Sequence, residues 1–365
     1  MRIDFHGRLS TEPQIRAGFV GCGSHAFRNL YPALQFVPID LVAVCDFDGD
    51  RARAFARQFG ATASYTDHRE MLEAEQLEAV FLCTGYDELG RPTYPDLARD
   101  ALHAGCHVWM EKPPAASCAA IEAMQQAANE AQRQVMVGLK KMFFPANEKA
   151  HALMSQESFG SPHLLTQQYP QYVPRQDEFD AFRAGQSVPS VTGFLDHLCH
   201  PASLLIFLLG MPQSLVFQRS IGGGGLATFS FESGAVASIV LSQGAGIANG
   251  MEHTMIVSDR GQRITVENNL RVTLHRMPPL SYGNTPDYFE GDAGNASLTW
   301  EPEFSLGQLY NKGLFLLGYY NEIAEFASAI REERTLNKGH LIHARQVTRI
   351  FEAFFEGPGA SIDLG

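Results

Sequence analysis

A strand-like run at residues 15–20 leads straight into Gly21-Cys22-Gly23-Ser24-His25-Ala26, which opens a helical pattern. In this G-x-G-x-x-A spacing, the first glycine permits a tight turn and the second lets a pyrophosphate approach the backbone closely. The alanine keeps the helix near the strand, and the start of the helix favours an anion. The spacing therefore predicts a dinucleotide half-site, although a plain strand–helix connection can also use glycine-rich turns.

Strands and helices alternate through the first half of the chain. The strand-like runs are residues 15–20, 41–45, 79–83, 107–110 and 134–137. The helical patterns between them cover residues 26–36, 49–59, 95–104 and 116–132. This alternation predicts a parallel, doubly wound sheet, the Rossmann arrangement of an α/β domain.

The second half changes to a series of strands separated by turn residues, which predicts an open, mostly antiparallel β-sheet. The expected strands are residues 163–169, 214–220, 227–231, 235–241, 253–258, 263–267 and 271–275. The expected helices are residues 145–156, 193–209, 316–331 and 340–355. We therefore expect an α/β domain at residues 1–145 and an α+β domain at residues 146–365, with the terminal helices able to pack back on the first domain.

The length of 365 residues exceeds what one core usually holds, which agrees with two domains. A net charge of −12 argues against a nucleic-acid partner, because such a protein needs a basic face. Residues 1–14 lack the apolar core of a signal peptide, and no run approaches the roughly 20 apolar residues that cross a bilayer. We expect a cytoplasmic protein with no membrane partner.

The six cysteines have no paired spacing, so we expect buried free thiols in a reducing compartment. They are Cys22, Cys45, Cys83, Cys106, Cys118 and Cys199. No zinc-binding pattern occurs, and no metal is expected.

The second predicted strand ends in Asp46, roughly 20 residues beyond the glycine motif, where an acid accepts hydrogen bonds from the adenosine ribose. The next residue is Phe47, and no arginine adjoins it to take a 2′-phosphate. This favours NAD over NADP. The alternative role of Asp46 is to cap the following helix, but Asp48 and Asp50 are also placed for that.

The fifth predicted strand ends in Glu111-Lys112-Pro113. In an open α/β sheet, residues just beyond the carboxyl ends of the strands line the ligand crevice. Lys112, held by a rigid proline, is therefore placed to meet both the nicotinamide and a substrate hydroxyl. The alternative is a surface lysine at the start of a loop.

Together with other segments along nearly the whole chain, these motifs resemble the Gfo/Idh/MocA family of oxidoreductases. The matching segments are Phe19-Val20-Gly21-Cys22-Gly23, Pro32-Ala33-Leu34, Val42-Ala43-Val44-Cys45-Asp46, Ala104-Gly105-Cys106-His107-Val108 with Glu111-Lys112-Pro113, Val137-Gly138, Gly193-Phe194-Leu195-Asp196 with His200, and Tyr319-Tyr320-Asn321-Glu322-Ile323. The resemblance implies a Rossmann domain followed by a domain whose open sheet serves in contacts within a homodimer or homotetramer.

The resemblance also implies an NAD(P)-dependent enzyme that transfers a hydride between nicotinamide and a secondary alcohol of a sugar, inositol or related polyol. Lys112, Asp196 and His200 match the catalytic positions of the family. The expected cofactor-binding residues are Gly21, Cys22, Gly23, Ser24, His25, Ala26, Asp46, Thr84, Glu111 and Lys112.

Asp196 and His200 are four residues apart, which places them on one face of a helix. A carboxylate beside an imidazole fixes its orientation, and a histidine with a pKa near neutrality suits removal of a hydroxyl proton. Lys112 would stabilise the developing alkoxide, and which of Lys112 and His200 is the formal base stays open. The alternatives are a partly buried Asp–His pair, or a metal site that adds His197, although His197 projects from another face of the helix.

Four features depart from the family pattern. The loop after residue 84 is longer than usual, and Tyr94, Met142 and Ser203 replace a histidine, an arginine and an aspartate that are frequent there. These departures leave the identity of the substrate open.

Two long stretches, residues 170–192 and 277–302, are expected to lack regular structure and to complete the pocket. Tyr169, Tyr172 and Arg175 precede the catalytic helix and are candidates for substrate contact; the alternative is an ordinary surface loop. Two other functions stay open, namely a hydrolase or lyase that uses tightly bound NAD for transient oxidation, and a non-catalytic dinucleotide-binding regulator.

Overall fold

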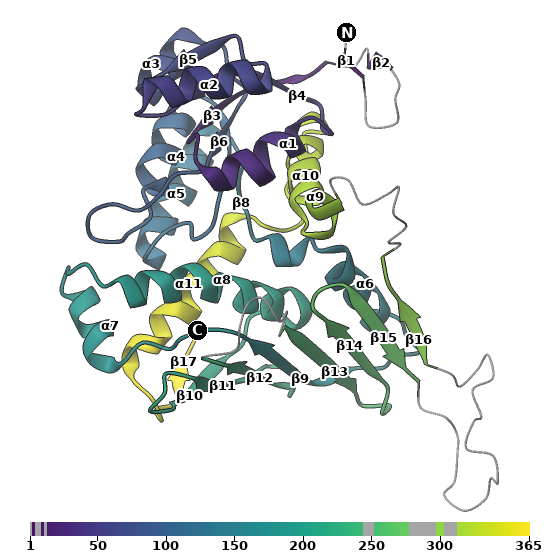
Figure 1. The fold of residues 1–365 in the computed structure, drawn as a ribbon. Coiled ribbons are helices and arrows are strands. Elements are labelled where there is room, and N and C mark those ends of the chain that lie inside the picture. Colours follow the sequence, from purple (N-terminus) through teal and green to yellow (C-terminus); the bar gives the residue numbers. More distant parts are fainter. Residues whose placement is uncertain (1, 4–8, 11–12, 244–251, 277–296, 303–311) are drawn as a thin grey trace, which may run out of the picture.

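The computed structural model describes residues 2–3, 9–10, 13–243, 252–276, 297–302 and 312–365. Two large sheets make up most of it, and Figure 1 shows them one above the other with helices between them. A two-stranded ribbon of β1 (Arg2–Ile3) and β2 (Leu9–Ser10) lies at the N-terminus.

The first sheet is parallel and six-stranded, in the order β5-β4-β3-β6-β7-β8. Its strands are β3 (Ile15–Val20), β4 (Ile39–Cys45), β5 (Ala63–Tyr65), β6 (Ala79–Leu82), β7 (His107–Met110) and β8 (Val135–Val137). The central strand β6 is buried along its whole length, as expected of a parallel sheet covered on both faces. The predicted doubly wound sheet is confirmed, and β5 is a strand that was not predicted.

Helices flank this sheet. They are η1 (Ala26–Leu30), α1 (Tyr31–Leu34), α2 (Gly49–Phe59), α3 (His68–Ala74), α4 (Tyr94–His103) and α5 (Cys118–Ala131). The helix predicted after the glycine motif begins as the π-helical turn η1, because Pro32 has no N–H to continue the α-helical ladder. The side chain of Asp48 accepts hydrogen bonds from the N–H groups of Asp50 and Arg51 and caps α2, so Asp46 is not the capping residue.

The second sheet has nine strands in the order β16-β15-β14-β13-β9-β12-β11-β10-β17. They are β9 (Pro162–Tyr169), β10 (Ser214–Arg219), β11 (Gly225–Ser230), β12 (Val236–Leu241), β13 (His253–Ser258), β14 (Arg263–Glu267), β15 (Arg271–His275), β16 (Leu298–Trp300) and β17 (Ile362–Asp363). All neighbours are antiparallel except β9 and β12. The predicted open, mostly antiparallel sheet is confirmed, whereas most of the expected loop at residues 277–302 lies outside the described residues.

Further helices follow the first sheet in the chain, and Figure 1 shows α8 between the two sheets. They are η2 (Lys140–Met142), α6 (Pro145–Met154), α7 (Gln176–Arg183) and α8 (Pro189–Leu209). The expectation that residues 170–192 lack regular structure is wrong, because they contain α7 and the first turn of α8. By length and composition α8 could span a membrane, but 72% of its apolar window is buried within the fold, as in the core helix of a globular protein.

The chain ends with α9 (Lys312–Leu316), α10 (Tyr319–Arg331), α11 (Leu341–Ala353) and η5 (Phe354–Glu356). Helix α10 returns to the first sheet, where Phe326 meets Phe81 edge to face at 5.7 Å between ring centroids. Just before α11, the carbonyl of Gly339 accepts a hydrogen bond from the N–H of Val137 in β8 at 2.7 Å. The C-terminal residues thus complete the first layer, and a domain boundary at residue 145 stays a prediction.

Candidate active site

A cavity of about 820 Å³ opens at the carboxyl ends of β3, β4 and β6. Seven of the predicted cofactor residues line it, namely Gly21, Cys22, Gly23, Ser24, His25, Asp46 and Thr84. Ala26, the first residue of η1, is fully buried, as its expected packing role requires. The structure therefore brings this predicted set together around one cavity.

Two glycines shape the turn at this cavity. Gly21 has a φ of +107°, and a Cβ there would lie 2.0 Å from the carbonyl oxygen of Cys83. A Cβ at Gly23 would meet nothing within 4 Å, so the backbone faces open space where the helix starts. Open space beside a helix start fits the pyrophosphate of a dinucleotide.

Asp46 is held firmly at the end of β4. Its Oδ2 accepts the N–H of Cys22 at 2.8 Å, and its Oδ1 accepts the N–H of Asp48 at 3.0 Å. The guanidinium of Arg51 comes within 3.6 Å of Oδ1, and Arg51 also lines the cavity. No arginine adjoins Asp46 in the chain, but one lies beside it in space, which weakens the sequence argument for NAD over NADP.

A second cavity of about 230 Å³ continues the first toward Lys112. The two cavities share His25, Cys83, Thr84, Gly85 and Tyr86. Tyr94, Glu111, Lys112, Pro113 and Asp196 complete the lining of the second. A ligand that fills the first cavity can therefore reach the residues around Lys112.

Lys112 and Asp196 form an ion pair in the second cavity. The Nζ atom of Lys112 lies 2.7 Å from Oδ1 of Asp196. Burial alone would lower the pKa of Lys112, but the carboxylates of Asp196 and Glu111 raise it above its usual value. Lys112 is therefore charged at neutral pH, as a donor to a substrate oxygen must be.

Glu111 lies beneath this pair, only 4% exposed. Its Oε1 is 2.9 Å from Nε2 of His25, and its Oε2 accepts the N–H of Lys112 at 3.0 Å. Burial alone would raise the pKa of Glu111, but His25 and Lys112 lower it below its usual value. Glu111 is thus an anion that fixes His25 and the backbone of Lys112 at the border between the two cavities.

The contact expected between Asp196 and His200 is not formed in the described part of the chain. The imidazole that approaches Asp196 is that of His197, whose Nε2 lies 3.7 Å from Oδ2. His200 faces Tyr169, with ring centroids 6.1 Å apart. Burial, with Lys112 and other lysines nearby, lowers the pKa of His200 well below its usual value, so its ring is neutral at pH 7.

Tyr86 is a site residue that was not predicted. Its hydroxyl donates a hydrogen bond to Oδ1 of Asp196 at 2.8 Å, the same oxygen that Lys112 contacts. The only sequence signal was the unusual length of the loop that carries it.

Two lysines of η2, Lys140 and Lys141, lie near the site. Lys141 pairs with Glu252, and Nζ of Lys140 donates to the hydroxyl of Tyr319 at 2.8 Å. Burial lowers the pKa of both lysines. Both lie close enough to His200 to lower its pKa as well, so they help to keep that ring neutral.

The candidate substrate residues before α8 do not all reach the site. Tyr169 lies beside His200 and under the ammonium of Lys141. Tyr172 donates its hydroxyl to Glu178 at 2.9 Å, and Arg175 pairs with its neighbour Asp177. None of Tyr169, Tyr172 and Arg175 lines either cavity, nor does His200, although His200 lies close enough to Lys112 for the ammonium to lower its pKa.

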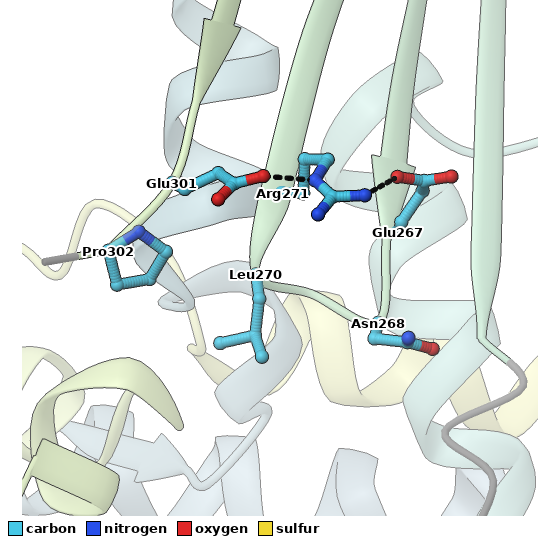
Figure 2. A pocket seen from close by; sticks show the side chains of 6 residues that line it. All are labelled: Glu267, Asn268, Leu270, Arg271, Glu301 and Pro302. Atoms are coloured by element: carbon cyan, nitrogen blue, oxygen red, sulfur yellow. Dashed lines mark hydrogen bonds and ion pairs between the residues drawn. The ribbon is translucent and has the colours of Figure 1, made fainter. Parts of the chain in front are cut away.

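Another hollow, of about 270 Å³, lies at the ends of β14, β15 and β16 in the second sheet (Figure 2). Arg271 forms ion pairs with Glu267 and Glu301 there, so the charged side chains of this hollow already have partners. In the part of the chain that the structure describes, no group of three His, Cys, Asp or Glu residues could hold a metal ion. The cavities around Gly21 and Lys112 are therefore the candidate active site.

Comparisons with known proteins identify an NAD-binding Rossmann fold in the first part of the chain. Residues 15–139 match a family model described as an oxidoreductase family with an NAD-binding Rossmann fold. The chain is 26% identical to a D-apiose dehydrogenase of Paraburkholderia graminis over 298 residues, 76% of each chain. It is 24% identical to a myo-inositol 2-dehydrogenase of Thermotoga maritima over 272 residues, 71% of this chain and 77% of that one.

A solved structure shares the fold. It is an oxidoreductase of Agrobacterium radiobacter in complex with NAD⁺, L-tartaric acid and magnesium, with a TM-score of 0.76 at 16% identity. The match covers 96% of this chain and 99% of that one. Residues 15–139 thus belong to a family of NAD-binding Rossmann-fold oxidoreductases, and most of the chain is similar to named dehydrogenases.

Proposed function

We propose that this enzyme transfers a hydride between a secondary alcohol of a sugar, inositol or related polyol and NAD. The observation that carries the proposal is the ammonium of Lys112, which lines the small cavity beside Asp196 that adjoins the cavity around the glycine motif. The relatives that match more than two thirds of the chain are named as dehydrogenases of D-apiose and myo-inositol, which supports this substrate class.

Three residues would act on the alcohol. The charged Lys112 donates a hydrogen bond to the substrate oxygen and stabilises the negative charge that develops there. His200 lines neither cavity, but its neutral ring would accept the hydroxyl proton of an alcohol that reaches past Asp196, a role that Lys112 cannot take while it is protonated. Asp196 holds the ammonium of Lys112 in place. When bound, the nicotinamide supplies the acceptor for the hydrogen on the carbinol carbon.

The cofactor assignment extends the family match. Asp46 is placed to accept hydrogen bonds from the adenosine ribose, which favours NAD. Arg51 beside it would offset part of the repulsion between Asp46 and a 2′-phosphate. We therefore propose NAD as the preferred cofactor, with NADP as a weaker one.

The other functions are less well supported. The relatives named as dehydrogenases favour net oxidation over a hydrolase or lyase that uses NAD transiently, and a regulator has no need of the Lys112–Asp196 pair. We also propose a homo-oligomer in the cytoplasm. Partly exposed Leu226, Val236 and Val240 on the second sheet support a contact between copies, which light scattering would test.

The test of the function is a screen of myo-inositol, D-apiose and related sugars with NAD⁺ and NADP⁺, followed by NADH or NADPH absorbance. Lys112→Ala should lower kcat/KM on the active polyol by about 100- to 1,000-fold, because one donor to the developing charge is lost. Lys149→Ala is the matched control, because Lys149 lies in α6 with its ammonium packed on the ring of Trp300. Full activity of Lys112→Ala, or turnover of a substrate without net NADH, would refute the proposal.

A further inference from the structure

Residues 85–93 form a loop, here called the bridging loop, that joins the first sheet to the helices of the second. The hydroxyl of Thr192 in α8 donates to the carbonyl of Gly90 at 3.0 Å. The guanidinium of Arg91 donates to the carbonyl of Phe182 in α7 at 2.8 Å and lies 4.5 Å from the centre of its ring. The loop is thus anchored to α8, the helix that carries Asp196, and to its neighbour α7.

Gly90 permits this close docking. Its φ is +75°, and a Cβ there would lie 2.3 Å from the hydroxyl of Thr192. Inside the loop, Oδ1 of Asp87 accepts the N–H groups of Leu89 and Arg91 at 2.9 and 2.8 Å. The bridging loop therefore has a defined shape, and it presents Tyr86 to the small cavity.

Tyr86 and Lys112 share one oxygen of Asp196. The hydroxyl of Tyr86 lies 2.8 Å from Oδ1, and Nζ of Lys112 lies 2.7 Å from the same atom. In the described part of the chain, Oδ2 has only the imidazole of His197 nearby, at 3.7 Å, which is longer than a hydrogen bond. The side chain of Asp196 is 26% exposed and lines the small cavity, so Oδ2 can accept a hydrogen bond from a bound molecule.

The contact does not serve packing, because Tyr86 keeps 40% of its surface exposed. Burial at its hydroxyl end, together with the charge of Asp196, raises the pKa of Tyr86 above its usual value. The phenol is therefore protonated at every pH at which the enzyme would work, and it remains a donor to Asp196.

We propose that Tyr86 is a positioning residue for the alcohol oxidation, acting through Asp196. The torsion that turns a carboxylate about its last bond is broad and roughly two-fold, so a single donor leaves the two oxygens of Asp196 free to exchange. Two donors on Oδ1 hold the group in one orientation and direct Oδ2 to a hydroxyl of the substrate. This inference rests on the proposed function, because it assigns Tyr86 a part in the same site.

Tyr86→Phe tests the proposal, since it keeps the ring and removes only the hydroxyl. With whichever polyol the wild type oxidises, we expect kcat to fall by about 10- to 100-fold, the loss of one hydrogen bond to a charged group. The KM for NAD⁺ should stay within about twofold, because the ring of Tyr86, which also lines the cofactor cavity, is kept and only the hydroxyl on Asp196 is removed. A variant that merely loosened the loop would also weaken cofactor binding, since Thr84 and Gly85 line both cavities.

The control is Tyr65→Phe. Tyr65 also donates its hydroxyl to a carboxylate, that of Glu75 at 2.9 Å, but it lines neither cavity. The kcat of Tyr65→Phe should match that of the wild type. An unchanged kcat in Tyr86→Phe, or a loss that appears only in the KM for NAD⁺, overturns the proposal.

A second measurement separates this inference from the function itself. If the wild type reduces NAD⁺ with none of the polyols, the proposed function fails, and crystal structures with NAD⁺ still test Tyr86. In Tyr86→Phe the carboxylate of Asp196 should turn or show two orientations, whereas it stays on Lys112 in the wild type. A single, unchanged orientation in the variant would overturn the positioning role.

Discussion

Glu322 is fully buried in the first turn of α10, and in the described part of the chain neither carboxyl oxygen has a hydrogen-bond partner. Burial, with Glu111 nearby, raises the pKa of Glu322 well above its usual value of 4.5. The folded protein therefore holds a proton at neutral pH that the unfolded chain releases. We expect Glu322→Gln, which is neutral at every pH and similar in shape, to increase the free energy of unfolding at pH 7.

The pH sets an upper limit on this gain. In the unfolded chain the carboxyl of Glu322 has a pKa of 4.5, about 2.5 units below pH 7, and it must take up a proton when the chain folds. Each unit is worth about 1.4 kcal/mol, so Glu322→Gln can stabilise the protein by at most about 3.4 kcal/mol at pH 7. A raised carboxyl pKa favours the folded state at low pH, and this advantage is lost as the pH rises from 4.5 toward the folded value. The gain from the substitution should therefore grow with pH.

Glu325→Gln, three residues along the same helix, is the matched control. The carboxylate of Glu325 accepts hydrogen bonds from both terminal nitrogens of Arg334 at 2.8 and 2.9 Å. Burial alone would raise the pKa of Glu325, but Arg334 lowers it. This substitution should therefore destabilise the protein at pH 7, and the loss should shrink as the pH falls through the lowered pKa.

Urea unfolding at pH 5, 7 and 8.5, followed by circular dichroism, measures both variants. Glu322→Gln should gain least at pH 5 and most at pH 8.5. A difference from the wild type that is equal at the three pH values would show that folding does not raise the pKa of Glu322, and would refute the reasoning.

Three further substitutions address the site. Gly21→Ala should cost at least about 1–3 kcal/mol, because an alanine at this positive φ is strained and its Cβ would meet Cys83; thermal unfolding and NADH fluorescence would show lower stability and lost binding. Asp46→Ala should lower kcat/KM about tenfold more with NAD⁺ than with NADP⁺, and Arg51→Ala should lower it about tenfold more with NADP⁺. Equal losses with both cofactors would count against these roles. The pKa of His200 is well below 6.5, so kcat/KM should stay constant near neutral pH and fall only when the pH drops through that lowered pKa. A fall of kcat/KM that begins at pH 7 and disappears in His200→Asn would contradict this assignment.

The fold was predictable wherever a local pattern carried it. The glycine motif and the regular alternation of strands and helices were sufficient for the first sheet. β5 was missed because it has only three residues, which are half-buried or exposed and give no clear apolar run. The helix α7 was missed because its two buried residues, Phe179 and Phe182, make too short a pattern among glycines and prolines.

The site was predictable only in part, because its decisive contacts join distant segments. The four-residue spacing of Asp196 and His200 suggested that they pair, but the ammonium of Lys112 attracts the carboxylate more strongly than a neutral ring does. No local pattern could reveal that pair, nor the hydroxyl of Tyr86 on the same oxygen. Lys112 itself was predictable, because its place at the end of a strand follows from topology.

The return of α10 to the first sheet affects how the protein can be made. Phe81 and Trp109, whose rings lie 5.8 Å apart in the first sheet, leave the ribosome long before Phe326 is synthesised to cover Phe81. Such long-range contacts delay completion of the fold and leave apolar surface open to aggregation or to chaperones in the meantime. The nascent cofactor domain is therefore expected to remain incomplete until almost the whole chain has emerged.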